Sequence, residues 1–172
     1  IILITNSENF QQTINESLYF KGVGLHTGNK CELKLIPAPI DYGIQFLIKN
    51  KNILIPATID YVSSTVRGTN LCKDNVFIFT IEHLLSALYA LDINNLKIEI
   101  SSNELPILDG SSNQYLEAIE KSGIKIQKKK AKEFVVNQLI SFKKFQDIQF
   151  YLIPSKTSKF TYYLNYKNID FL

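Results

Sequence analysis

Two hydrophobic periods follow one another along this chain, and their order is what most limits the folds open to it. Residues 31–36 and 96–101 alternate apolar and polar side chains, which predicts strands with one buried face. Between them, apolar residues from Ile81 to Leu91 recur at the three- and four-residue spacing of one α-helix face. The chain therefore has to bury both a sheet face and a helix face, which favours an α+β fold.

The remaining segments extend this pattern in both directions. Short apolar runs bounded by Asn, Gly, Pro and Ser predict further strands, and Gly123 suits the left-handed C-cap of a second helix. Thr80 is the expected N-cap of the first helix, and Ser111 or Ser112 that of the second. The expected strands cover residues 44–48, 53–59, 76–79, 133–142, 147–153 and 159–166, and the second helix covers residues 113–121.

A lysine-rich stretch at residues 125–132 separates the two halves of this pattern. Its low apolar content predicts a solvated linker, with binding of anionic phosphate or lipid headgroups as the alternative. We therefore predict a first domain over residues 1–126, a two-layer sandwich in which a mixed or antiparallel sheet packs on two helices. Residues 127–172 are expected to be a linker followed by the opening strands of an incomplete second domain.

The composition excludes several classes of protein. Of the 172 residues, 45% are hydrophobic and 20% are charged, which is typical of globular domains and not of disordered chains. A net charge of +3 gives no reason to expect a nucleic-acid partner, and no apolar run approaches the ~18 residues of a membrane span. Cys31 and Cys72 predict two free thiols in a reducing compartment. The lack of Met, and an apolar end at residues 170–172, lead us to expect a truncated chain.

Glu82 and His83, at the start of the first predicted helix, are the first candidates for chemistry. A carboxylate beside an imidazole suits a metal hydrolase, in which one group binds the metal and the other acts as general base. The alternative is an ordinary helix histidine, packed or exposed.

Two predicted turns carry further candidates. In GVGLHTG at 22–28, His26 is either a loop residue of a tight hairpin or part of a site. A strand and not a helix follows this turn, so the glycines do not form a dinucleotide-binding fingerprint. Asp109, in LDGS at 108–111, is typical of a turn whose carboxylate binds nearby backbone N–H groups.

The order and spacing of five motifs carry more information than any single motif. These are GVGLHTG at 22–28, PAP at 37–39, TNLC at 69–72, TIEHLLSAL at 80–88 and ELPILDGS at 104–111. Together they resemble the UDP-3-O-acyl-N-acetylglucosamine deacetylases, which carry out the committed step of lipid A synthesis. The resemblance is strong over about residues 12–124 and continues more thinly to the end of the chain.

The resemblance implies an enzyme of two similar domains with the active site between them. It implies that His83 is the first ligand of a Zn²⁺ cofactor and that Glu82 is the general base. His26 and Asp109 are expected near the site without binding the metal, and Asn70 stands where Met is common in the family. The residues expected to line the catalytic cleft are Thr69, Asn70, Leu71 and Cys72.

The implied substrate is UDP-3-O-acyl-N-acetylglucosamine, with no nucleic-acid partner and no stable membrane insertion. The complete protein is expected to be a monomer. Abundant Ile, Asn and Lys suggest an AT-rich genome, so the expected location is the bacterial cytoplasm, or the plastid stroma if the gene belongs to an organelle.

The chain departs from the family pattern in its ligands. The family's other zinc ligands are a His and an Asp of the second domain in an H-x-x-x-D arrangement, but this sequence has only two histidines. We therefore expect the intact gene product to be the deacetylase and this chain to lack most of the metal site. The alternative is a non-catalytic binding module that keeps the first-domain fold and contacts RNA or anionic lipid through its lysines and Tyr162, Tyr163 and Tyr166.

Overall fold

The computed structural model describes residues 2–144 and 148–164. The chain divides into two compact units, one of residues 7–131 and one that combines the first six residues with those from 132 onward. The long strands β1 (Ile2–Ile14) and β10 (Ile124–Val136) pair with each other and contribute to both units. Each unit is described by itself below.

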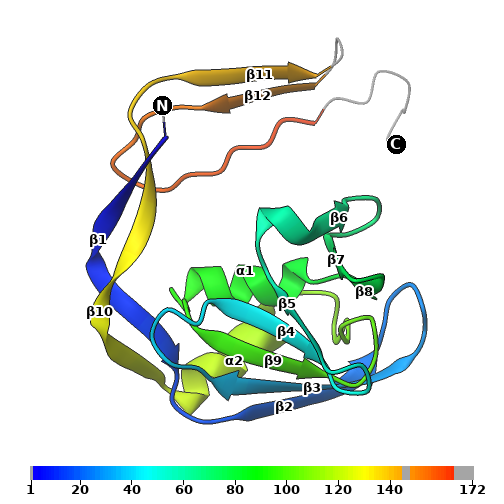
Figure 1. The fold of residues 1–172 in the computed structure, drawn as a ribbon. Coiled ribbons are helices and arrows are strands. Elements are labelled where there is room, and N and C mark those ends of the chain that lie inside the picture. Colours follow the sequence, from blue (N-terminus) through cyan, green and yellow to red (C-terminus); the bar gives the residue numbers. More distant parts are fainter. Residues whose placement is uncertain (1, 145–147, 165–172) are drawn as a thin grey trace. The chain divides into compact units, whose positions relative to one another are not determined.

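The larger unit is built on a five-stranded sheet with the strand order β2-β3-β9-β4-β5. Strands β4 and β9 run parallel and the other neighbours are antiparallel, so the sheet is mixed. Both helices cover one face of this sheet (Figure 1), and the predicted α+β fold is confirmed. The elements are β2 (Leu18–Val23), β3 (Lys30–Pro37), β4 (Ile44–Ile48), β5 (Ile53–Pro56), β9 (Leu96–Ile100), α1 (Glu82–Ala90) and α2 (Asn113–Ser122).

A smaller three-stranded sheet stands beside the start of α1 in the chain. It consists of β6 (Val62–Ser64), β7 (Asn70–Lys73) and β8 (Val76–Ile78), with β7 in the middle. A single 3-10 turn, η1 (Ile59–Tyr61), connects β5 to this sheet. Strand β8 leads through residues 79–81 into α1, which places the smaller sheet next to the start of this helix.

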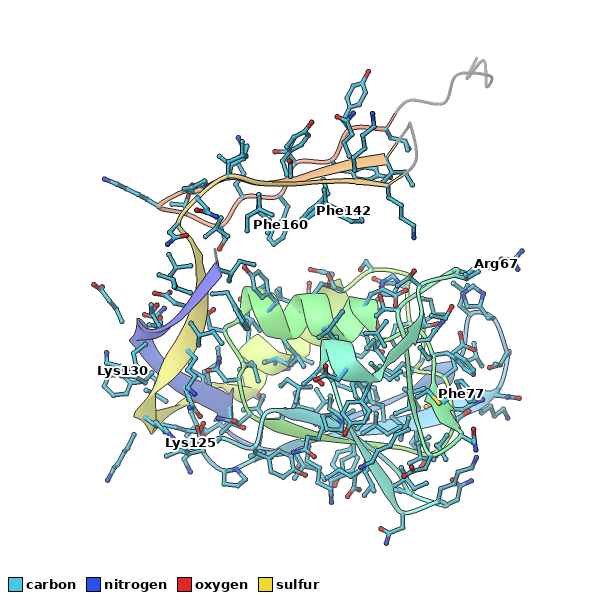
Figure 2. The ribbon with its side chains drawn as sticks, turned by 45° about the horizontal axis from the view of Figure 1, so that its top comes forward. Arg67, Phe77, Lys125, Lys130, Phe142 and Phe160 are labelled. Atoms are coloured by element: carbon cyan, nitrogen blue, oxygen red, sulfur yellow. The ribbon has the colours of Figure 1, made fainter. Side chains whose placement is uncertain are left out.

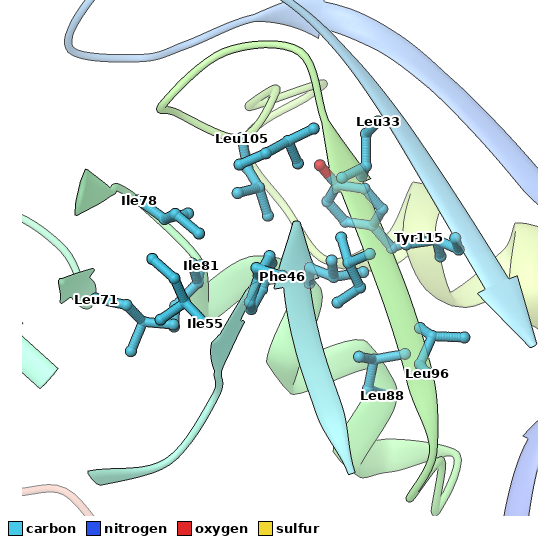
Figure 3. Close-up of a cluster of buried hydrophobic side chains, with 14 of the residues drawn as sticks. Leu33, Phe46, Ile55, Leu71, Ile78, Ile81, Leu88, Leu96, Leu105 and Tyr115 are labelled. Carbon is cyan, nitrogen blue, oxygen red and sulfur yellow. The ribbon is translucent and has the colours of Figure 1, made fainter. Parts of the chain in front are cut away.

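The residues of the two hydrophobic periods, one in the sheet and one in α1, together form the hydrophobic core (Figure 3). The alternating residues of the sheet point to the helices and are nearly fully buried, among them Phe46 at 0% and Leu33 at 1% exposure. Helix α1 adds Leu84 and Leu88, which lie on a single helix face. Each such side chain contributes roughly 1.5–3 kcal/mol on burial.

The ends of the elements test the sequence predictions. Strand β4 coincides with its predicted range, and Gly123 has the positive φ, 82°, of the expected C-cap. Thr80 as N-cap was wrong, because Ile81 occupies that position and the Thr80 hydroxyl binds elsewhere. The predicted strand 53–59 ends early, at Pro56, since proline has no N–H to donate to a ladder.

The linker predicted at residues 125–132 was wrong, although its lysine side chains are exposed to solvent as predicted. These residues lie within the strand β10, and Figure 2 shows Lys125 and Lys130 on it. Exposed lysines are compatible with a strand at the surface, and two of them have ammonium groups with partners. Lys130, for example, places its Nζ 4.1 Å from the ring centroid of Phe10 and donates to a β1 carbonyl, and Lys129 pairs with Asp41.

In the smaller unit, β11 (Ile140–Lys144) and β12 (Ile148–Leu152) form an antiparallel pair. Phe142 lies opposite Phe150 on one face, and these side chains are 59% and 56% exposed. The strand expected at 159–166 is not formed over its described part, residues 159–164, and the rest, including Tyr166, lies outside the described residues. The hairpin therefore has one apolar face that is largely open to solvent within the described part of this unit.

Candidate active site

The start of α1 is fixed to strand β7 by backbone and side-chain hydrogen bonds. The Ile81 N–H donates to the Thr69 carbonyl at 3.2 Å, and the Thr80 N–H donates to Oδ1 of Asn70 at 3.2 Å. Asn70 is only 8% exposed, so its amide is a built-in support and not a surface group. These bonds set where the first turn of the helix, with Glu82 and His83, begins.

Glu82 is held in a defined orientation at this helix start. The Thr69 N–H donates to its Oε2 at 2.9 Å, which is a charge-assisted bond. Gly68 makes room for the carboxylate, because a Cβ at that position would lie 3.2 Å from Oε1. The negative charge is also favoured in the first turn of a helix.

His83 lies beside this carboxylate and outside the leucine core. Its Nε2 is 3.9 Å from Oε1 of Glu82, and the two side chains, His83 and Glu82, are 28% and 37% exposed. Leu84 and Leu88 point into the core on the other side of the helix. The Glu–His pair is therefore accessible to a ligand or a substrate.

His26 is brought to the same neighbourhood from the loop between β2 and β3. Its Nε2 lies 2.8 Å from the carbonyl oxygen of Arg67, the residue directly before Gly68. Arg67 lies at the outer end of the connection between β6 and β7 (Figure 2). The structure thus connects His26 to the loop that cradles Glu82 and shows no direct bond between their side chains.

The four residues predicted to line a cleft have different surroundings. Thr69 and Cys72 are half-buried, and Asn70 is turned inward to Thr80. The Leu71 side chain is 1% exposed and packs in the core with Ile78 and Ile81 (Figure 3), so it does not reach a surface where a substrate could contact it. Neighbouring side chains of β7 point to opposite faces, and both faces are covered at Asn70 and Leu71, which are 8% and 1% exposed.

Asp109 belongs to a separate surface turn. Its Oδ1 accepts bonds from the backbone N–H of Ser111 at 2.9 Å and from the Ser111 hydroxyl at 3.0 Å. These bonds hold the pKa of the Asp109 carboxyl below its usual value. The structure links Asp109 to the approach to α2 and not to Glu82.

Glu104 is the residue that sequence reasoning missed, although it stands first in one of the five motifs. Its side chain is fully buried, at 0% exposure, in the segment between β9 and α2. Burial alone raises the pKa of this carboxyl, but hydrogen bonds from Thr27, His26 and Thr80 outweigh burial and leave the pKa below its usual value. A buried carboxylate with this many hydrogen-bond donors has a structural role. In the sequence, Glu104 was marked only as a single acidic residue next to an apolar run.

The described residues offer only part of a metal site. Among residues 2–144 and 148–164, no group of three His, Cys, Asp or Glu side chains is arranged to hold a metal ion. The accessible imidazole of His83 and the adjacent carboxylate of Glu82 are suited to form one part of such a site. Neither helix of this described portion is long and apolar enough to cross a bilayer.

The site combines a carboxylate and an imidazole, the residue types that metal-dependent hydrolases use as general base and metal ligand. Comparison with known proteins is more specific. The family model for UDP-3-O-acyl N-acetylglycosamine deacetylase (LpxC) matches residues 11–171. This chain therefore belongs to the LpxC family, whose members are metal-dependent deacetylases.

Individual relatives agree with the family match. The chain is 37% identical over 159 residues to the UDP-3-O-acyl-N-acetylglucosamine deacetylase of Thermodesulfovibrio yellowstonii, covering 92% of this chain and 54% of the relative. It is 42% identical over 127 residues to the enzyme of that name from Saccharophagus degradans, covering 73% and 42%. With a bifunctional enzyme LpxC/FabZ of Chlorobaculum tepidum, 37% identity extends over 161 residues, 92% of this chain and 34% of the relative. The chain thus spans about half the length of these relatives, or less.

Proposed function

We propose that the protein containing this chain hydrolyses the N-acetyl group of UDP-3-O-acyl-N-acetylglucosamine in lipid A biosynthesis. The observation that carries the proposal is the accessible pair of Glu82 and His83, 3.9 Å apart at the start of α1, in a chain of the deacetylase family. Sequence similarity alone does not say which groups carry out the chemistry. In this proposal, the pair supplies both a proton acceptor and a metal ligand.

Glu82 acts as the general base in this proposal. A water molecule that attacks the acetyl carbonyl has to lose a proton, and a carboxylate within hydrogen-bond reach accepts it. The Thr69 N–H occupies Oε2, so Oε1, on the side of His83, is the oxygen that receives the proton. Fixing one oxygen also fixes the direction of the other, which reduces the reorganisation needed during the reaction.

His83 provides one ligand for the metal, which we propose is Zn²⁺. A bound Zn²⁺ lowers the pKa of water and stabilises negative charge on the carbonyl oxygen. The further ligands are proposed to come from parts of the protein outside this chain, since the relatives are longer than it. Thr69 and Cys72 are proposed to border the substrate, while the buried side chains of Asn70 and Leu71 support them, and His26 is proposed to lie near the site without binding the metal.

The roles can be separated by measuring acetate release and zinc content in the intact protein. Glu82→Gln is expected to lower kcat by about 10²-fold or more, with zinc retained, because the variant loses only the proton acceptor. His83→Ala is expected to lose both activity and stoichiometric zinc. Glu120→Gln, an exposed carboxylate on α2, is the matched control and should retain both. Normal turnover in Glu82→Gln, or full zinc in His83→Ala, contradicts the assigned roles.

The remaining features of the proposed enzyme rest on its family. A UDP-linked acyl sugar is the proposed substrate, with no nucleic-acid partner and no stable membrane insertion. A monomeric state and a location in the bacterial cytoplasm, or in the plastid stroma if the gene belongs to an organelle, are proposed with it. Size-exclusion chromatography and fractionation of the source cells check the last two.

We also propose that residues 127–172 open a second domain that is completed by other parts of the intact protein. The open apolar face of β11 and β12, with Phe142 opposite Phe150, supports this proposal. Phe142→Ala is then expected to cost less than about 0.5 kcal/mol in residues 1–172 and about 3 kcal/mol or more in the intact protein. Equal costs in the two contexts contradict the second domain.

A further inference from the structure

Glu104 is a buried carboxylate that the proposed chemistry does not use. Three donors converge on its two oxygens: Oε1 accepts from the His26 N–H at 2.9 Å and from the Thr80 hydroxyl at 3.1 Å, and Oε2 accepts from the Thr27 N–H at 2.8 Å. These donors are 24 to 78 residues away along the sequence. The carboxylate therefore joins separate segments of the chain at one point.

Thr80 is the first of these segments and adopts an unusual conformation. Its φ is +59°, in the left-handed region that a β-branched residue rarely enters. Two bonds hold it there, from its N–H to Asn70 and from its hydroxyl to Glu104. Since Thr80 stands two residues before Glu82, its backbone sets the direction in which α1 leaves strand β8.

The loop at residues 24–28 is the second segment. At Gly24, a Cβ would overlap Oε2 of Glu104, so only glycine lets the backbone come this close. The same loop presents the imidazole of His26 to the carbonyl of Arg67. Arg67 leads into Gly68 and Thr69, the residues that hold the carboxylate of Glu82.

Glu104 therefore reaches Glu82 by two independent routes. One runs through Thr80 to the start of the helix, and the other runs through His26 and Arg67 to the loop around the carboxylate. Both routes end on the carboxylate of Glu82, whose orientation matters for the proposed reaction. Neither route involves contact between Glu104 and a substrate.

We propose that Glu104 is a positioning residue, whose buried carboxylate sets the orientation of Glu82 and His83 by holding Thr80 and the 24–28 loop in place. This inference rests on the proposed function for its kinetic consequence, although its structural part does not. A glutamine cannot replace the carboxylate, because its NH₂ group turns a donor toward one of the three donors already present.

Steady-state kinetics of the intact protein with the UDP-linked substrate provide the first test. Glu104→Gln and Thr80→Val are each expected to lower kcat about 10–100-fold with KM changed less than about threefold, because substrate binding remains while the base is misplaced. The double variant should be no slower than the worse single variant, since both changes break the same link. Thr80→Ser keeps the hydroxyl and should recover at least half of the wild-type kcat. Glu32→Gln, at an exposed carboxylate on β3, is the control.

A second measurement does not depend on turnover. The chain has only two histidines, so the imidazole ¹H–¹⁵N signals of His26 and His83 can be assigned in residues 1–172. The His83 signals should shift in Glu104→Gln and in Thr80→Val, and they should stay in place in Glu32→Gln. Unchanged His83 signals in folded Glu104→Gln and Thr80→Val overturn the proposal, and so does a fully additive loss of kcat in the double variant.

The two failures are distinguishable. If wild type and Glu82→Gln turn over equally, the proposed function fails, and the histidine signals alone decide the role of Glu104. If Glu82→Gln is inactive while Glu104→Gln and Thr80→Val keep the wild-type kcat, the function stands and the positioning role is overturned.

Discussion

The two helices of the larger unit begin in different ways. Helix α2 follows a surface turn in which Asp109 binds Ser111 and the Ser111 hydroxyl accepts the Asn113 N–H at 3.1 Å. Helix α1 follows Thr80, whose left-handed backbone is supported by the buried carboxylate of Glu104. In both cases the N-cap residue itself makes no side-chain bond to the helix.

The two helix starts differ in how far along the sequence their supporting groups lie from them. The turn before α2 is made by residues close to one another in the chain, so its direction is a local property. The start of α1 depends on Asn70 and Glu104 and, through Glu104, on the loop at 24–28. A helix start supported from several segments has a fixed place in the fold, which is what a site at that start requires.

Removing the two carboxylates is expected to give the largest contrast. Glu104→Ala leaves three donors without their partner and should lower the free energy of unfolding by about 2–4 kcal/mol. Asp109→Ala removes bonds at an exposed turn, where water replaces them, so the free energy of unfolding should hardly change. Urea unfolding of both variants measures the difference, and equal costs would remove the distinction between the two helix starts.

Glycine substitutions test the close approach at α1 against an open turn at α2. In Gly24→Ala the new Cβ would overlap Oε2 of Glu104, and the overpacking should cost about 1–3 kcal/mol. A Cβ added at Gly110 would meet nothing within 4 Å, but the φ there is +84°, so Gly110→Ala should cost about 1 kcal/mol from backbone strain. The two variants also differ in the His83 signals, which only Gly24→Ala should shift.

Acid titration should show a smaller effect with a defined sign. Because the folded-state pKa of Glu104 lies below its usual 4.5, its ionisation stabilises the fold fully above that value and progressively less as pH falls through the folded-state pKa. The stability difference between wild type and Glu104→Gln should therefore be largest at neutral pH and narrow as pH falls through 4.5 and below. A difference that widens on acidification would mean that Glu104 is protonated in the folded protein.

The smallest effect is expected at the local turn. Ser111→Ala removes the hydroxyl that accepts the Asn113 N–H, on an exposed residue, and should cost about 0.5 kcal/mol or less. Thermal unfolding monitored by circular dichroism is sufficient to detect it. A cost comparable to that of Glu104→Ala would show that the start of α2 is as deeply supported as that of α1.

Local patterns predicted the fold well and the site only in part. Strands β4 and β9 and the Gly123 cap follow from periods and turn chemistry that involve neighbouring residues. The left-handed conformation of Thr80 could not be predicted, because a threonine before a helix is also what a helix N-cap requires. The role of Glu104 could not be predicted either, because its hydrogen-bond donors come from distant segments of the sequence. The lysine-rich strand β10 was mistaken for a linker because its partner, β1, lies far from it along the chain.

The unequal surroundings of the two cysteines make the site open to selective chemical labelling. Cys31 is 1% exposed, and burial raises the pKa of its thiol, so it reacts slowly with alkylating reagents. Cys72 is half-buried on β7, two residues after Asn70, which supports the start of α1. A fluorophore attached to this chain under native conditions should therefore enter mainly at Cys72, on the strand whose Asn70 supports the start of α1.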